Sequence, residues 1–155
     1  MPIICEGKKI PSFNAEATSG KEIEFKNLLG RPIVLYFYPK DSTPGCTLEG
    51  EDFRDNYQRF RQQQATIFGI SRDNLNSHEK FKSKYNFPFE LITDPDEKLC
   101  KLFDVIKEKN MYGKKYIGIE RSTFLIDAQG VLRKEWRKVK VKGHVNDVLN
   151  AVKEL

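Results

Sequence analysis

Residues 33–46 read IVLYFYPKDSTPGC and run from an apolar segment through a polar turn to a cysteine. The first six residues are β-branched, aromatic or leucine, and such an unbroken run is typical of a strand buried on both faces of a sheet. Pro39 ends the run, because proline has no N–H to donate to a neighbouring strand. From Cys46 to about Gln63 the sequence predicts a helix with one apolar stripe, formed by Phe53, Tyr57 and Phe60.

A second buried strand is predicted at residues 65–70, and strand, helix, strand at this spacing indicates a right-handed parallel crossover. Later segments predict a helix capped by Asn76, a helix that starts at Asp94, and strands at 122–127 and 131–137, followed by a closing helix. Residues 107–118 are polar and are interpreted as an exposed loop. The chain of 155 residues is therefore expected to form one α/β domain over 1–155, with a central mixed sheet flanked by helices.

Composition excludes several classes of protein. Apolar residues make up 39% and charged residues 32% of the chain, and no run approaches the roughly 18 apolar residues of a membrane span. Residues 1–7 lack a basic segment followed by an apolar one, so no secretory signal is expected. Cysteines are few and odd in number (Cys5, Cys46 and Cys100), which favours a reducing cytoplasm over a secreted disulfide scaffold.

Metal and nucleic-acid partners are not expected either. His78 and His144 are far apart in sequence and show no zinc-ligand spacing, so a structural zinc site is not expected. No other metal and no organic cofactor is expected for this chain. The net charge of +5 is densest at residues 133–142, where apolar and basic residues alternate as on a strand with one solvated face. Without a recognition motif this does not predict nucleic-acid binding. A non-catalytic binding or chaperone-like module that uses this basic surface stays an alternative.

Cys46 is the candidate for chemistry. It follows a Pro-Gly pair and enters the first turn of the predicted helix, where unpaired amides and the helix dipole favour a thiolate over a thiol. Pro39 and Pro44 restrict the backbone, and Thr43 can place a hydroxyl beside the sulfur. The alternative is a buried, inert cysteine. A position between a loop and a helix, after two prolines, favours the reactive thiol.

Two other cysteine chemistries fit less well. Position 49 is a glutamate, so the motif is not Cys-x-x-Cys and a thiol–disulfide oxidoreductase would lack its second sulfur. A thiol–disulfide oxidoreductase remains the alternative enzyme. A cysteine hydrolase needs a base near its nucleophile, and nothing in the sequence links His78 or His144 to Cys46.

At these residues the sequence resembles the peroxiredoxins. Pro39, Thr43 and Cys46 meet the pattern Pro-x-x-x-Thr-x-x-Cys. The longer stretch YPKDSTPGCTLE at 38–49 is similar to the bacterioferritin comigratory protein, or peroxiredoxin Q, subfamily. Further similar stretches at 70–73, 94–96 and 120–127 extend the resemblance over nearly the whole chain.

The resemblance implies a thioredoxin-like fold and thiol-dependent reduction of hydrogen peroxide and organic hydroperoxides. Cys46 would be the peroxidatic cysteine that forms a sulfenic acid, and Arg121 the active-site arginine that polarises the O–O bond together with Thr43. Pro39 would shape the pocket and exclude water. The implied reductant is thioredoxin or another thiol, and the implied state is a cytoplasmic monomer.

The sequence departs from the subfamily at the second thiol. A resolving cysteine five residues after the peroxidatic one would stand at position 51, which is Glu51. The next helix also has no cysteine, and Lys82 is the nearest match there. Cys100 is interpreted mainly as a packing residue, but both it and Cys5 remain candidates for the resolving role. The electron donor therefore stays open.

Overall fold

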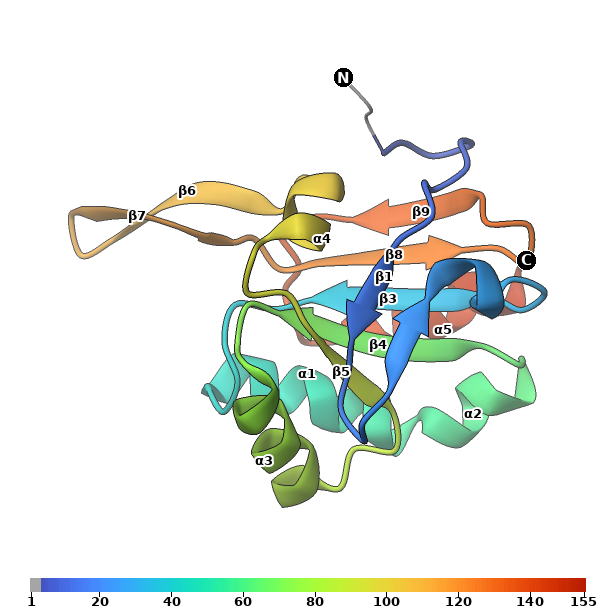
Figure 1. Cartoon of the computed structure of the whole chain (residues 1–155), viewed down its shortest axis with the longest axis horizontal. Coiled ribbons are helices and arrows are strands. Elements are labelled where there is room, and N and C mark those ends of the chain that lie inside the picture. The colour runs from blue at the N-terminus through green and yellow to red at the C-terminus, as the bar shows by residue number, and fades with distance from the viewer. Residues whose placement is uncertain (1–3) are drawn as a thin grey trace.

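A computed structural model describes residues 4–155 and contains a five-stranded central sheet (Figure 1). Three of the strands, β3, β4 and β5, are parallel, whereas β8 is antiparallel to β3 and β9 is antiparallel to β8. The sheet is therefore mixed, as predicted. Across it the order is β5 (Glu90–Thr93), β4 (Thr66–Ser71), β3 (Ile33–Phe37), β8 (Ser122–Ile126) and β9 (Leu132–Trp136).

The sheet separates two hydrophobic cores. Alternate residues of β3 point to opposite sides: Ile33, Leu35 and Phe37 into one core, Val34 and Tyr36 into the other. All five residues of this strand are buried, which confirms the strand predicted from the unbroken apolar run. We call the side of Val34 and Tyr36 the α1 face and the opposite side the α4 face.

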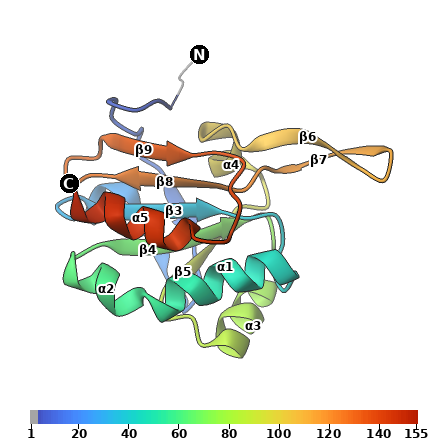
Figure 2. The ribbon, with the colours of Figure 1, turned by 180° about the vertical axis from the view of Figure 1, so that it is seen from behind.

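Helices cover the two faces unequally. The α1 face is covered by α1 (Pro44–Asp55), α2 (Tyr57–Gln62), α3 (Leu75–Tyr85) and α5 (His144–Lys153), as Figure 2 shows from behind. The short helix α4 (Lys98–Leu102), the 3₁₀ turn at Phe25–Leu28 and a small hairpin of β1 (Asn14–Glu16) and β2 (Glu22–Glu24) lie on the α4 face. Among the described residues, no helix is long and apolar enough to cross a bilayer. Met1–Ile3, part of the N-terminal stretch considered for a signal, lie outside the described residues.

Some predicted helix bounds were wrong. The helix expected from Cys46 to Gln63 is two helices that meet at Asn56, whose side-chain amide donates to the Asp52 carbonyl at 2.9 Å. Such a bond competes with the regular helical pattern, and the helix breaks there. Helix α3 is capped by Asn74, which accepts from the Ser77 amide at 2.8 Å, rather than by Asn76.

Residues 107–118, expected as a loop, lie in a β-hairpin that extends beyond the sheet in both views (Figures 1 and 2). It consists of β6 (Ile106–Met111) and β7 (Lys114–Ile119), paired antiparallel. Tyr112 and Gly113 form the two-residue turn with φ of 53° and 78°, the geometry that matches the twist of a hairpin. The loop interpretation was wrong because polar, lysine-rich strands carry little apolar signal.

Candidate active site

Cys46 lies at the junction of β3 and α1, as the sequence predicted. It is the third residue of α1 and only 2% of its surface is exposed. Thr43 is the N-cap in extended conformation, and Pro44 occupies the first helical position, where its missing N–H costs nothing. The Thr43 side chain makes no capping hydrogen bond, so amides of this turn stay available to an anion at the sulfur.

Arg121 reaches Cys46 from the neighbouring strand of the sheet. It directly precedes β8, whose first residue Ser122 pairs with Phe37 at the end of β3. Its Nη2 donates to the Cys46 Sγ at 3.4 Å, and its Nη1 donates to Glu49 Oε1 at 2.6 Å. The structure thus brings together two predicted site residues that lie 75 positions apart in the chain.

Gly45 makes room for this contact. A Cβ atom at this position would lie 3.1 Å from the Arg121 Nη2, closer than side-chain atoms ordinarily approach. The guanidinium therefore packs over the bare backbone of the first helical turn. The sequence analysis did not predict this packing of Arg121 over Gly45.

Glu49 is a site residue that the sequence analysis missed as a partner of Arg121. It lies three residues after Cys46, on the same side of α1, and is fully buried. Burial raises the Glu49 pKa to about 7, although the charge of Arg121 acts in the opposite direction. Its Oε2 atom finds no hydrogen-bond partner among the described residues. The signal in the sequence that could have identified Glu49 is its position three residues after Cys46.

Thr43 and Pro39 belong to the loop that leads from β3 to Cys46. The Thr43 hydroxyl donates to the Lys40 carbonyl at 2.8 Å, so its hydrogen stabilises the turn rather than the sulfur, and its oxygen remains an acceptor. Pro39 is partly buried and lines a shallow open hollow together with Arg72 and Asp73. Neither Thr43 nor Cys46 lines that hollow.

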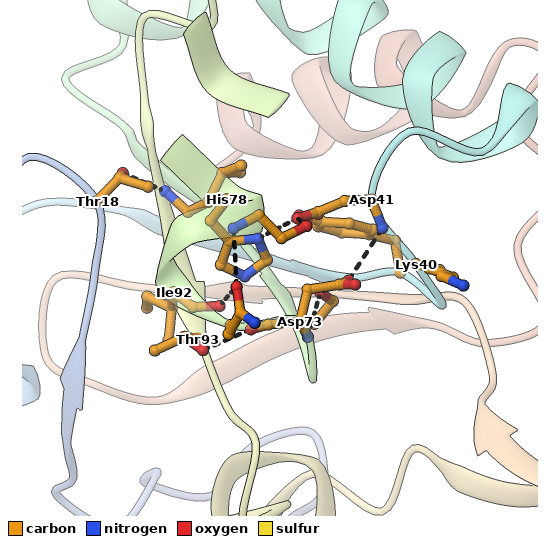
Figure 3. Close-up of polar contacts among 12 residues, drawn as sticks. Thr18, Lys40, Asp41, Asp73, His78, Ile92 and Thr93 are labelled. Atoms are coloured by element: carbon orange, nitrogen blue, oxygen red, sulfur yellow. Dashed lines mark hydrogen bonds and ion pairs between the residues drawn. The ribbon is translucent and has the colours of Figure 1, made fainter. Parts of the chain in front are cut away.

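The loop between β3 and α1 is fixed by a buried polar network (Figure 3). Asp41 accepts from the hydroxyls of Tyr38 at 2.6 Å and Ser77 at 2.7 Å, and its amide donates to Asp73 at 3.0 Å. The His78 ring joins the Asp41 carboxylate at 2.7 Å to the Ile92 carbonyl at 2.9 Å. These bonds tie the loop before Cys46 to α3, β4 and β5, which restricts its motion.

The same network contains a group of potential metal ligands. One donor atom from each of Asp41, Asp73 and His78 lies within 4.8 Å of the others. Those atoms are already engaged: His78 contacts Asp41 and Ile92, and Asp73 accepts from the Asp41 amide. We assign the cluster to the support of the loop.

The other two cysteines lie away from Cys46. Cys100 belongs to the core on the α4 face, whereas Cys46 belongs to the core on the α1 face. Burial and then the neighbouring Asp94 raise the pKa of the Cys100 thiol well above its usual value. Cys5 is partly buried near β9, where the Gly7 amide donates to the Leu132 carbonyl.

His144 is the other buried histidine, and it faces Thr123. Its Nε2 lies 2.7 Å from the Thr123 hydroxyl, and burial lowers its pKa to about 4, with a smaller contribution from Arg121. Within residues 4–155, neither His144 nor His78 forms a hydrogen bond with Cys46. This arrangement gives no support to a cysteine hydrolase.

Comparisons with known proteins find a matching family, similar sequences and similar solved structures. The model of the AhpC/TSA family matches residues 6–135. Peroxiredoxin Bcp of Bacillus subtilis is 50% identical over 149 residues, which cover 96% of this chain and 95% of that protein. A structure of the Xanthomonas campestris bacterioferritin comigratory protein, described in terms of its alkyl peroxide reduction activity, is 49% identical with a TM-score of 0.87 and covers 92% and 90% of the two chains. A mutant of Xylella fastidiosa PrxQ is 42% identical with a TM-score of 0.92, covering 97% and 96%.

Proposed function

This chain belongs to the AhpC/TSA family and is a peroxiredoxin, a thiol-dependent peroxidase, and from this premise we propose that Cys46 is its peroxidatic cysteine. The observation that carries the proposal is the 3.4 Å contact from Arg121 to the Cys46 sulfur in the first turn of α1. Hydrogen peroxide and organic hydroperoxides are the proposed substrates.

In the proposed reaction the Cys46 thiolate attacks the distal oxygen of the peroxide. The S–O bond forms as the O–O bond breaks, and water or an alcohol leaves after it takes up a proton. Cys46 becomes a sulfenic acid. The sulfur is oxidised by two electrons and the peroxide is reduced by two.

Thiol acidity alone gives little acceleration. Lowering the pKa of a thiol from about 8.5 to about 6 raises its thiolate fraction at neutral pH roughly thirty-fold. The same change weakens the nucleophile roughly ten- to eighteen-fold, for a Brønsted slope near 0.4–0.5. Most of the rate must therefore come from groups that stabilise the charge developing on the leaving oxygen.

We assign that work to Arg121 and the orientation of the peroxide to Thr43. The guanidinium, held by Glu49 and seated over Gly45, offers N–H donors beside the sulfur. The Thr43 oxygen can accept from the peroxide O–H and orient it, because its own hydrogen is donated to Lys40. Pro39 shapes the entrance and excludes water.

An external thiol, thioredoxin or another reductant, is proposed to restore Cys46. Cys100 is buried on the opposite face of the sheet, so the structure gives no support to its serving as the resolving cysteine. Cys5 lies beside β9 rather than α1. We further propose that residues 1–155 act as one domain and as a cytoplasmic monomer, with no membrane or nucleic-acid partner.

Peroxide consumption tests the assignment. Purified protein supplied with dithiothreitol should consume hydrogen peroxide and an alkyl hydroperoxide, and the Cys46→Ser variant should not. The Cys5→Ser/Cys100→Ser double variant is the matched control and should keep turning over. Consumption by Cys46→Ser at the parental rate would overturn the assignment.

Intact-mass analysis tests the recycling route. One equivalent of peroxide should add one oxygen, which a sulfenic-acid reagent traps on Cys46, and excess peroxide should add a second and inactivate the enzyme. A loss of two hydrogens that disappears in Cys100→Ser would instead show a Cys46–Cys100 disulfide.

A further inference from the structure

Arg121 stands between two groups that can each carry a negative charge. Its Nη2 faces the Cys46 sulfur at 3.4 Å, and its Nη1 faces Glu49 at 2.6 Å. Burial opposes the guanidinium charge, yet Glu49 and Cys46 raise the Arg121 pKa above its ordinary value. Arg121 therefore stays a cation, and at least one of the two acids has to balance it.

Both acids are withdrawn from water, Cys46 with 2% and Glu49 with 0% of its surface exposed. A thiolate and a carboxylate beside a single guanidinium would leave one uncompensated negative charge in a site of low dielectric, which is strongly unfavourable. Burial already raises the Glu49 pKa to about 7. Both acids contact the same guanidinium, so the charge of one bears on the charge that the other can carry.

We propose that Cys46 and Glu49 share one proton, so that Glu49 is neutral while Cys46 is a thiolate and becomes a carboxylate when Cys46 is oxidised. The inference rests on the proposed function of Cys46 and deepens it. The Glu49 Oε2 atom supports it, because a fully buried carboxylate oxygen with no donor among the described residues is better accommodated in a neutral acid.

The charges balance through the oxidation step. The thiolate sulfur bonds to the distal peroxide oxygen, the O–O bond breaks, and the leaving oxygen takes up one proton. Glu49 releases one proton in the same step, and its new carboxylate replaces the lost thiolate as the partner of Arg121. The pair of acids carries one negative charge before and after the step, and the site draws no net proton from solvent.

The groups around Glu49 are compatible with this exchange. Asp52, on the same helix, raises the Glu49 pKa further, and the Tyr36 phenol of β3 is kept neutral by burial, which raises its pKa well above the usual value. On the hairpin, burial and then Arg121 lower the pKa of Lys109, which lies towards Arg121 and Cys46. His144 of α5 is neutral near pH 7, because burial lowers its pKa to about 4.

Proton counting during a single turnover tests the proposal. Reduced protein in weak buffer near pH 7 is mixed with one equivalent of hydrogen peroxide, a pH indicator follows proton uptake, and mass analysis of the same sample counts the oxygen on Cys46. The parent protein should take up about zero protons per sulfenic acid formed, because the shared proton supplies the leaving oxygen.

Glu49→Gln is the informative variant. Glutamine keeps an oxygen acceptor for Arg121 but cannot release a proton, so the pH profile of Cys46 alkylation by iodoacetamide should move to lower pH. At a pH where that profile has reached its plateau, oxidation should now draw about one proton from solvent. Glu51→Gln is the matched control on the same helix, partly exposed and beside Arg54, and should behave like the parent.

The outcomes distinguish a failure of the proposed function of Cys46 from a failure of the shared proton. If Cys46 gains no oxygen, the proposed function fails and the inference falls with it. If Cys46 gains one oxygen while the parent takes up about one proton, as Glu49→Gln does, the shared proton is wrong and Glu49 only anchors Arg121. The parent count is taken at a pH where the alkylation profile of the parent has reached its plateau, so that Cys46 is a thiolate, because oxidation of a thiol would draw no proton from solvent either. Under that condition the count decides the matter even if Glu49→Gln does not fold.

Discussion

Cys46 and Cys100 occupy equivalent places on opposite faces of the sheet. Each is buried, and each is the third residue of a helix that follows a sheet strand. Their neighbours carry opposite charges. The Arg121 cation donates to the Cys46 sulfur. The pKa of Cys100 is raised mainly by burial and additionally by the Asp94 carboxylate. A helix N-terminus therefore does not make a cysteine reactive by itself.

The difference also lies in how the helix amides are used. Asp94 accepts from the amides of Leu99 at 3.0 Å and Cys100 at 2.8 Å, so the N-terminus of α4 already holds an anion. Thr43 makes no such capping bond in α1. The first turn of α1 keeps its capacity for a thiolate, and the first turn of α4 does not.

The largest effect is expected from removal of the Arg121 guanidinium, the charge that distinguishes the surroundings of Cys46 from those of Cys100. Arg121→Met should slow oxidation of Cys46 by hydrogen peroxide about 10²–10³-fold, the cost of losing one donor to a developing oxyanion. Stopped-flow measurement of sulfenic acid formation would give the rate. Alkylation of Cys46 by iodoacetamide should fall far less, and equal losses in both reactions would mean that Arg121 acts only on thiol ionisation.

Alkylation of the folded parent protein sharpens the comparison. At pH 8 iodoacetamide should modify Cys100 at least about a hundredfold more slowly than Cys46, because the thiol is buried and its pKa is raised. Peptide mapping by mass spectrometry would report both sites. In denaturant the two rates should converge, and a persistent difference there would point to local sequence rather than to the fold.

Removal of the Asp94 carboxylate tests the Cys100 half of the comparison. Asp94→Ala leaves two amides of α4 without their acceptor and should lower the free energy of unfolding by about 1–2 kcal/mol, measured with urea. Cys100 should become more reactive towards iodoacetamide, while peroxide turnover stays unchanged. Asp96→Ala, at an exposed position two residues on, is the control. No destabilisation relative to that control would contradict the capping role.

The smallest effect is expected from the second thiol itself. Cys100→Ala removes a buried sulfur from the core on the α4 face and should cost about 1 kcal/mol of stability. Steady-state peroxide consumption should equal that of the parent. A loss of turnover with dithiothreitol as the reductant would reopen a role for Cys100 in recycling.

The strand and the position of Cys46 in the first turn of a helix were predictable because their signals are local. The run Ile33–Tyr38 is apolar throughout, and the turn after it places Pro44 and Gly45 directly before Cys46. Arg121 was identified through the family resemblance, since a lone arginine before a strand has the pattern of a surface charge. The pairing of β3 with β8 explains how a residue so distant in the chain reaches the sulfur.

Other features depend on contacts that one sequence does not display. A glutamate on a helix ordinarily faces solvent, whereas Glu49 is buried and pairs with Arg121, the residue that directly precedes β8. The break at Asn56 depends on a side-chain bond, and its neighbours otherwise continue the helical pattern. The hairpin strands escaped prediction because lysines occupy many of their positions.

That hairpin has a practical consequence for engineering. Its strands bond to each other, and the Tyr112 side chain at the tip is 96% exposed. Insertions are best tolerated at such exposed turns, because they disturb neither a core nor a sheet. A fluorescent domain grafted between Tyr112 and Gly113 would sit on a hairpin whose second strand ends two residues before Arg121, which makes this turn a natural attachment point for a peroxide biosensor.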